Sequence, residues 1–267
     1  MWCSGWRLAA AVSNAGGLGL LGAGSMHPET LREHIRKCHE ATHHACGVNI
    51  PLMYPQIEEI MQIVADEGVK IVFTSAGSPK KWTGWLHERG ITVVHVVSSS
   101  RFAVKAEEAG VDAVVAEGFE AGGHNGREET TTLCLIPAVR AVTTLPLIAA
   151  GGIATGEAML AARVLGAEGV QIGTRFALTA ESSANEVFKD YCLHLEEGDT
   201  RLLLKKLAPV RLVRNNFRSA VEAAEAVGAS EEELRILLGR GRAKRGIFEG
   251  DLEEGVLEIG QVSALLH

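Results

Sequence analysis

One histidine of this sequence lies where it could take part in chemistry. His124 follows the apolar run DAVVAEG, with Gly122 and Gly123 before it and Gly126 just after it. An imidazole there can take or give a proton near neutral pH, or polarise a carbonyl or nitro oxygen by hydrogen bonding. The flanking glycines let the backbone approach a planar ligand closely. We therefore predict that His124 is catalytic or orients a substrate, and a purely structural role is the alternative.

Two further glycine-containing segments, PLIAAGGI and GVQIGTRF, each close an apolar run. Backbone N–H groups of such turns, together with the start of a short helix, form the usual phosphate site of a (β/α)8 barrel. We predict a phosphate cradle at Gly151, Gly152, Gly173 and Thr174. The alternative is that these glycines serve only tight turns.

The predicted site residues need a scaffold that positions them, and the chain has regularly spaced apolar runs that can form its strands. The predicted strands are 18–24, 46–50, 70–77, 91–97, 112–118, 146–152 and 168–173, with amphipathic helical segments between them. The runs show little alternation, which indicates parallel strands covered on both faces. A closed barrel and a doubly wound sheet both fit this regular alternation of strands and helices. We favour an α/β fold of the (β/α)8 TIM barrel type, because glycine or polar residues follow most of the predicted strands.

A barrel of this kind needs eight strands, and the pattern provides seven. We expect the first strand to be lacking, so that either the sequence begins after it or another segment replaces it. The strand and helix alternation stops near residue 196. We therefore expect a barrel over 1–195 and a C-terminal helical region over 196–267, which either caps the barrel mouth or is a plain appendage.

Composition narrows the possible partners. A formal charge of −7 over 267 residues argues against nucleic acid or an anionic membrane surface as partner. No apolar run is long enough to span a bilayer and no secretory signal is evident, so we expect a cytoplasmic protein. Five widely spaced cysteines without a CxxC suggest neither a disulfide framework nor a thiolate metal site.

Two short segments match known motifs, but their position in the chain argues against the function that each motif usually indicates. GLGLLG, residues 17–22, fits a dinucleotide-binding pattern, but here a strand follows the glycines instead of preceding them. HEATH, residues 39–43, fits the zinc motif HExxH, but it ends a helix on the predicted outer surface and has no third ligand in reach. We predict no metal site.

The segments AVSNAGGLGLLGAGSM, GVNIPL, AEGFEAGGHNG, LIAAGGIATG and VQIGTRF together resemble a known family. They are similar to the FMN-dependent nitronate monooxygenases (2-nitropropane dioxygenases) and enoyl-acyl carrier protein reductase II. The resemblance covers nearly the whole chain and implies an FMN-containing barrel. Family members normally begin with a strand ending in QGGM, and this chain starts at or near that methionine.

Carried over by position, the resemblance places the FMN phosphate on the cradle predicted above and makes His124 the catalytic histidine. Residues implied to face the rest of FMN are Asn49, Ser75, Ala116, Glu117, Gly122, Gly123 and Gln171.

The resemblance leaves the activity open. The segments KLAPVRLVRNNF, GTRFALTAESSAN and GDLEEGVLEIGQVSALL favour an enoyl reductase, with NADPH or NADH as reductant and an acyl thioester, free or on acyl carrier protein, as substrate. The alternative is a nitronate monooxygenase that oxidises alkyl nitronates with oxygen. A second alternative is a truncated barrel without catalysis. We expect a homodimer, since twofold pairs are the commonest assembly.

Overall fold

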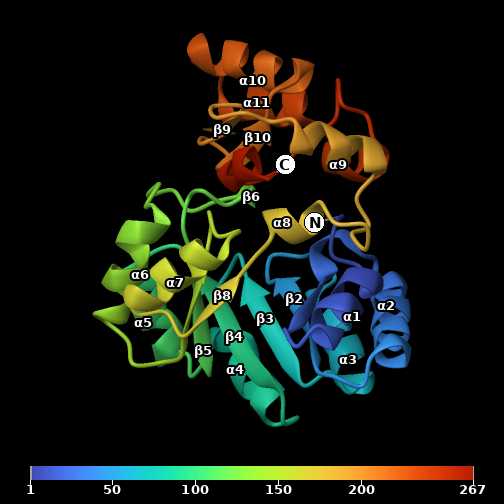
Figure 1. Cartoon of the computed structure of the whole chain (residues 1–267), viewed down its shortest axis with the longest axis vertical. Coiled ribbons are helices and arrows are strands. Elements are labelled where there is room, and N and C mark those ends of the chain that lie inside the picture. The colour runs from blue at the N-terminus through green and yellow to red at the C-terminus, as the bar shows by residue number, and fades with distance from the viewer. Residues whose placement is uncertain (1, 267) are drawn as a thin grey trace.

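The computed structural model describes residues 2–266. Seven parallel strands form one curled sheet, in the order β1-β2-β3-β4-β5-β7-β8 (Figure 1). Each neighbouring pair is parallel. The strands are β1 (Gly19–Gly22), β2 (Cys46–Pro51), β3 (Ile71–Ser75), β4 (Thr92–Val97), β5 (Ala113–Glu117), β7 (Leu147–Ala150) and β8 (Gly169–Gln171). All seven predicted strands are confirmed, as is the barrel-like α/β fold.

Helices cover the outside of this sheet (Figure 1). They are α1 (Trp6–Asn14), α2 (Pro28–Ala41), α3 (Ile57–Asp66), α4 (Lys80–His87), α5 (Ser100–Glu108), α6 (Thr132–Arg140) and α7 (Gly156–Val164). The short helix α8 (Thr174–Ala177) lies instead at the carboxyl end of β8, and a 3-10 turn at Ala23–Ser25 follows β1. Local signals fix where several of them begin. The hydroxyl of Thr155, for example, accepts a hydrogen bond from the Ala158 N–H at 3.2 Å and caps α7.

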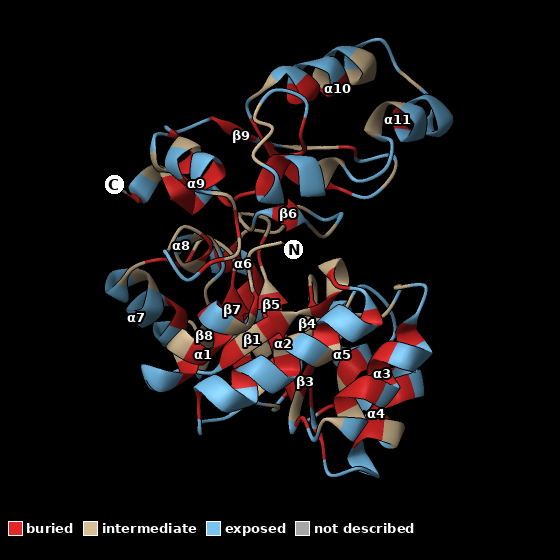
Figure 2. Ribbon diagram, turned by 90° about the vertical axis from the view of Figure 1, so that its right-hand side faces the viewer, coloured by how far each residue is buried: buried red, intermediate tan, exposed pale blue. Residues whose placement is uncertain are grey.

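Two apolar layers hold the barrel together. Phe73, Val94 and Val115 point into the barrel interior, whereas neighbours such as Val93 and Val114 pack outward against the helices. Side chains of a strand alternate between its two faces, so each continuous apolar run serves both layers. Burial on both faces is visible in the red central strands of Figure 2.

The curled sheet has an open seam within residues 2–266, because β1 and β8 each pair with one neighbour only. The N-terminal segment lies beside the end of β1. The backbone N–H of Gly22, the last residue of β1, donates to the carbonyl of Ser4 at 3.0 Å. The Ser4 hydroxyl in turn donates to the carbonyl of Leu20.

The C-terminal region lies over the carboxyl ends of the strands (Figure 1). We include in it α9 (Glu186–Leu193), which precedes the expected boundary at residue 196. The other elements are β9 (Thr200–Leu203), β10 (Val210–Val213), α10 (Asn216–Ala226), α11 (Glu231–Leu238), a π-helical turn at Lys244–Phe248 and a 3-10 turn at Gln261–Leu265. The strands β9 and β10 were not predicted. With β6 (Gly123–His124), they form a three-stranded antiparallel sheet in the order β6-β10-β9. This sheet joins the loop after β5 to the C-terminal region.

Within residues 2–266, no helix combines the length and hydropathy needed to cross a membrane. The described residues also hold no group of three or more histidine, cysteine or acidic side chains arranged to bind a metal ion.

Candidate active site

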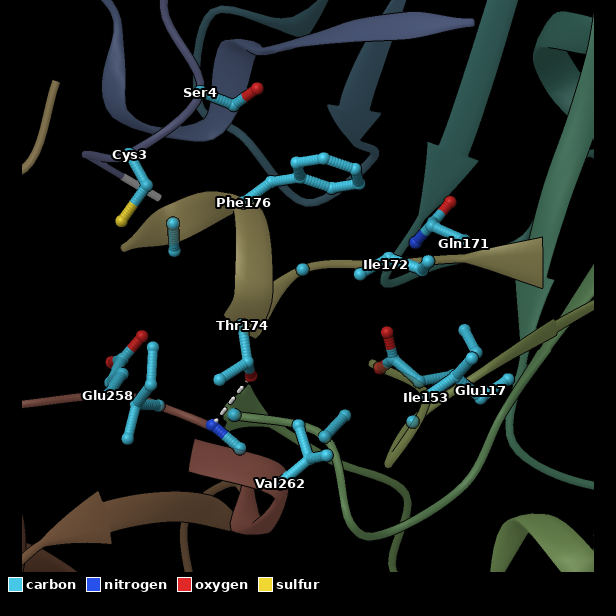
Figure 3. A pocket seen from close by; sticks show the side chains of 18 of the residues that line it. Cys3, Ser4, Glu117, Ile153, Gln171, Ile172, Thr174, Phe176, Glu258 and Val262 are labelled. Atoms are coloured by element: carbon cyan, nitrogen blue, oxygen red, sulfur yellow. Dashed lines mark hydrogen bonds between the residues drawn. The ribbon is translucent and has the colours of Figure 1, made fainter. Parts of the chain in front are cut away.

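A cavity of about 260 Å³ lies between the carboxyl ends of the strands and the C-terminal region (Figure 3). Its walls come from segments far apart in the sequence. They include Cys3, Ser4, Leu8, Gly22, Glu117, Ala121, Gly122, Ala150, Gly151, Gly152, Ile153, Gln171, Ile172, Gly173, Thr174, Phe176, Ala177, Ile247, Glu258, Ile259, Gly260 and Val262.

The turn after β7 requires glycine. Gly151 and Gly152 have φ angles of +92° and +68°, in the left-handed region that side chains disfavour. A Cβ on Gly151 would also lie 2.6 Å from the carbonyl oxygen of Gly118. The turn after β5 and the turn after β7 therefore pack backbone against backbone, and their shape depends on the missing side chains.

Four backbone N–H groups on this wall have no acceptor in the described chain. They belong to Gly151, Gly152, Gly173 and Thr174, and none of them donates a hydrogen bond within residues 2–266. All four residues line the cavity. Gly173 also leaves open space, because a Cβ placed there would meet no atom within 4 Å. Unpaired N–H donors around such a space suit an anionic group such as a phosphate.

The side chain of Glu120 holds the glycine turn in place. Its carboxylate accepts from the N–H and the hydroxyl of Thr132, each at 3.0 Å. The Thr132 hydroxyl also lies 2.8 Å from the carbonyl oxygen of Gly151. This arrangement ties the loop after β5 and the start of α6 to the turn after β7.

Glu117 and Gln171 lie at the ends of β5 and β8, on either side of Ala150, and both line the cavity (Figure 3). Burial raises the pKa of the Glu117 carboxyl to about 7. Its side chain makes no hydrogen bond or ion pair with another residue between 2 and 266. A carboxyl group that titrates near neutral pH can donate or accept a hydrogen bond at the polar edge of a ligand.

The C-terminal segment closes the opposite wall. The Gly260 N–H donates to the Thr174 hydroxyl at 3.0 Å (Figure 3). The Gln261 N–H donates to the carbonyl of Glu120, also at 3.0 Å. Glu258 adds a second carboxylate to the cavity. Sequence reasoning missed these residues, since GVLEIG carries no motif that connects it to the strand ends.

The structure brings together seven of the predicted site residues. Glu117, Gly122, Gly151, Gly152, Gln171, Gly173 and Thr174 all line the cavity, whereas Asn49, Ser75, Ala116, Gly123 and His124 do not. Asn49 pairs in register with Gly22, a cavity residue, and Ser75 ends the adjacent strand.

Ala116 and His124 are placed differently from the site residues around them. The side chain of Ala116 packs into the layer between sheet and helices, because it alternates with Glu117 on the strand. His124 is exposed on β6, paired with Val210 and two residues from Gly122 in the cavity wall. Its catalytic role stays a prediction.

The fold and the cavity together define a barrel-type α/β protein with a cavity, lined by backbone N–H groups of glycine turns, at the carboxyl ends of its strands. Comparison with known proteins then identifies the family. The family model described as nitronate monooxygenase matches residues 1–62 and 55–267. The chain belongs to the nitronate monooxygenase family of oxidoreductases, whose members are FMN-dependent flavoenzymes.

Three proteins that are similar to this chain are named for different activities. FabK from Thermotoga maritima is 41% identical with a TM-score of 0.91, and the match covers 99% of this chain and 84% of that chain. A probable nitronate monooxygenase of Staphylococcus aureus is 32% identical over 73% of this chain and 67% of its own length. A Mycobacterium tuberculosis dehydrogenase, named for an octahydro-indene-carboxyl-CoA compound, is 29% identical over 99% of this chain and 85% of its own length.

The cavity residues fit FMN. The four unpaired N–H groups at Gly151, Gly152, Gly173 and Thr174 suit its phosphate, because a dianion needs several donors and this wall supplies them from the backbone. Glu117 and Gln171 would provide polar side chains for the remainder of the cofactor.

Proposed function

We propose that this protein is an enoyl-thioester reductase of the enoyl-acyl carrier protein reductase II type, with NADPH or NADH as reductant. The observation that carries the proposal is the likeness to FabK, an enoyl-acyl carrier protein reductase II, over 99% of the chain at 41% identity. The mycobacterial relative, which also matches 99% of this chain, is named for a CoA thioester. These two relatives are the matches that favour a thioester substrate.

FMN, when bound, supplies hydride transfer between the nicotinamide and the β-carbon of the enoyl thioester. The glycine turns would hold the phosphate through backbone N–H groups, and the segment from Glu258 to Gly260 would cover one side of the bound cofactor. In this proposal the imidazole of His124 donates a hydrogen bond to the thioester carbonyl. Such a donor stabilises the negative charge that develops on that oxygen and helps to protonate the α-carbon.

The test compares two reactions of the FMN-loaded protein. Under anaerobic conditions we expect crotonyl-CoA to drive oxidation of NADPH or NADH, and saturated butyryl-CoA, the matched control, to drive none. In air, an alkyl nitronate such as ethyl nitronate is then supplied and oxygen uptake is followed.

Each outcome decides between the candidate activities. The Staphylococcus aureus relative favours the monooxygenase as second candidate, and oxygen uptake driven by nitronate without crotonyl-CoA reduction would establish it. FMN-loaded protein that turns over neither substrate would instead support a barrel without catalysis.

A further inference from the structure

Arg211 on β10 is the most deeply buried arginine described, with 1% of its surface exposed. Burial lowers its pKa, which reflects the cost of holding a charge away from water. Within residues 2–266, no carboxylate lies within ion-pair distance of its guanidinium. A buried charge without a counter-ion is costly to keep, so its hydrogen-bond partners indicate what it does.

The partners of Arg211 lie mainly on one loop, residues 118–122, between β5 and β6. Its Nε lies 3.2 Å from the carbonyl oxygens of both Phe119 and Ala121, and its Nη2 lies 2.5 Å from the Phe119 oxygen. The guanidinium carbon also lies 4.9 Å from the centre of the Phe119 ring. The remaining bond, from Nη1 to the Thr200 hydroxyl at 3.3 Å, anchors the side chain to β9.

The same loop forms part of the cavity wall. Ala121 and Gly122 line the cavity, and His124 follows two residues later. Arg211 also pairs in register with Gly123 across the β6–β10 ladder. The ribbon of β6 lies between the barrel and the C-terminal region in both views (Figures 1 and 2). The loop is thus held by a residue of the C-terminal region that does not itself line the cavity.

We propose that Arg211 is a positioning residue that fixes the 118–122 loop, and through it His124, against the cavity. The inference rests on the proposed function only for its consequence in turnover, because the loop geometry stands on the contacts alone. Arginine suits the role because its planar guanidinium presents several donors in a fixed arrangement. A lysine ammonium at the same site is a point charge on a flexible stem and does not reproduce that arrangement.

The primary test is hydrogen exchange of the loop in the FMN-free protein, which requires no activity. The Phe119 N–H donates to the carbonyl of Thr130 at 3.0 Å and the Ala121 N–H donates to that of Gly118 at 3.1 Å, so both amides report on the loop. In Arg211→Met we expect them to exchange about 10- to 100-fold faster, the factor expected for losing hydrogen bonds to a charged donor. Arg211→Lys should give an intermediate increase with a milder effect on folding.

Arg218→Met is the matched control. Arg218 is also buried in the C-terminal region, at 7% exposed, but its Nη1 donates to the Asp199 carbonyl at 2.6 Å and it does not contact the 118–122 loop. We expect this variant to lower the unfolding temperature without faster exchange at Phe119 and Ala121. Unchanged loop exchange in both Arg211 variants, or an equal increase in the control, would overturn the proposal.

A second readout addresses turnover. Per mole of bound FMN and below the unfolding temperature, we expect Arg211→Lys to lower kcat by about tenfold with a smaller change in the KM for the nicotinamide, because small displacements of a catalytic group slow the reaction. Wild-type kcat alongside a loosened loop would refute the link to His124. If the wild-type protein turns over no thioester, the proposed function fails while the exchange experiment still decides the role of Arg211.

Discussion

A methyl group at position 173 tests the phosphate cradle with little disturbance of the fold. Gly173 has a φ of −99°, which any residue can adopt, and a Cβ there would meet no atom within 4 Å. Replacing glycine by alanine at a compatible position stabilises a protein by about 0.4–1 kcal/mol, because the unfolded chain loses freedom. For a chain of this size, that gain raises Tm by about 1–4 °C.

The same substitution should weaken FMN binding. Gly173 contributes one of the four unpaired N–H groups, and a methyl group beside it enters open space at the cavity wall. Loss of one hydrogen bond to a charged phosphate costs about 1.5–3 kcal/mol. The dissociation constant for FMN should therefore rise by roughly 10- to 100-fold.

The assay is titration of the FMN-free protein, followed through flavin fluorescence, together with thermal unfolding. Gly156→Ala is the matched control, because Gly156 begins α7, also has open space around it and does not line the cavity. Both variants should be slightly more stable than wild type, but only Gly173→Ala should lose affinity. Wild-type affinity for FMN in Gly173→Ala would refute the prediction that the Gly173 N–H binds the FMN phosphate.

Three more substitutions probe the site and its support. His124→Ala should retain FMN but lose turnover by about 100-fold or more, the range for a positioned acid–base group, and steady-state kinetics per bound FMN would show wild-type rates if the assignment is wrong. Gly151→Ala combines a φ of +92° with a Cβ only 2.6 Å from the Gly118 carbonyl, so urea unfolding should show a loss of at least about 2 kcal/mol. His95 is buried against the Thr74 hydroxyl at 2.7 Å, and burial lowers its pKa to about 4. Since the unfolded chain takes up this proton below pH 6.5 and the folded chain does not, the stability contributed by neutral His95 is lost as the pH falls from 6.5 to about 4, by about 2 kcal/mol at pH 5. Urea unfolding at pH 7 and pH 5 should show a smaller acid loss in His95→Gln than in wild type, and an equal loss would contradict the assignment.

The scaffold was predictable from the sequence because each parallel strand is a continuous apolar run with glycine or polar residues at its end. Parallel strands end at one edge of a sheet, so the sequence also indicated that residues at these ends lie close together, and Glu117, Gly151, Gln171 and Gly173 do line one cavity. Their contact with FMN stays a prediction.

The missed features share a physical cause, which is their dependence on tertiary contacts. β6 has two residues and exists only through its pairing with β10, so no periodicity reveals it. The wall at Glu258 and Gly260 is likewise set by contacts with Thr174 and Glu120 far away in the sequence. The same dependence applies to Ala116, whose side chain packs outward against the helices while that of its neighbour Glu117 lines the cavity, and its predicted contact with FMN stays a prediction.

The cavity wall draws on residues from Cys3 to Val262, and this has a consequence for how the protein is made. A ribosome adds about 5–20 residues per second, so these two contributions emerge on the order of tens of seconds apart. The nascent barrel strands can pair before the last wall segment exists. The complete cavity wall can therefore form only after nearly the whole chain has been synthesised, so the final shape of the cavity is set at the end of translation.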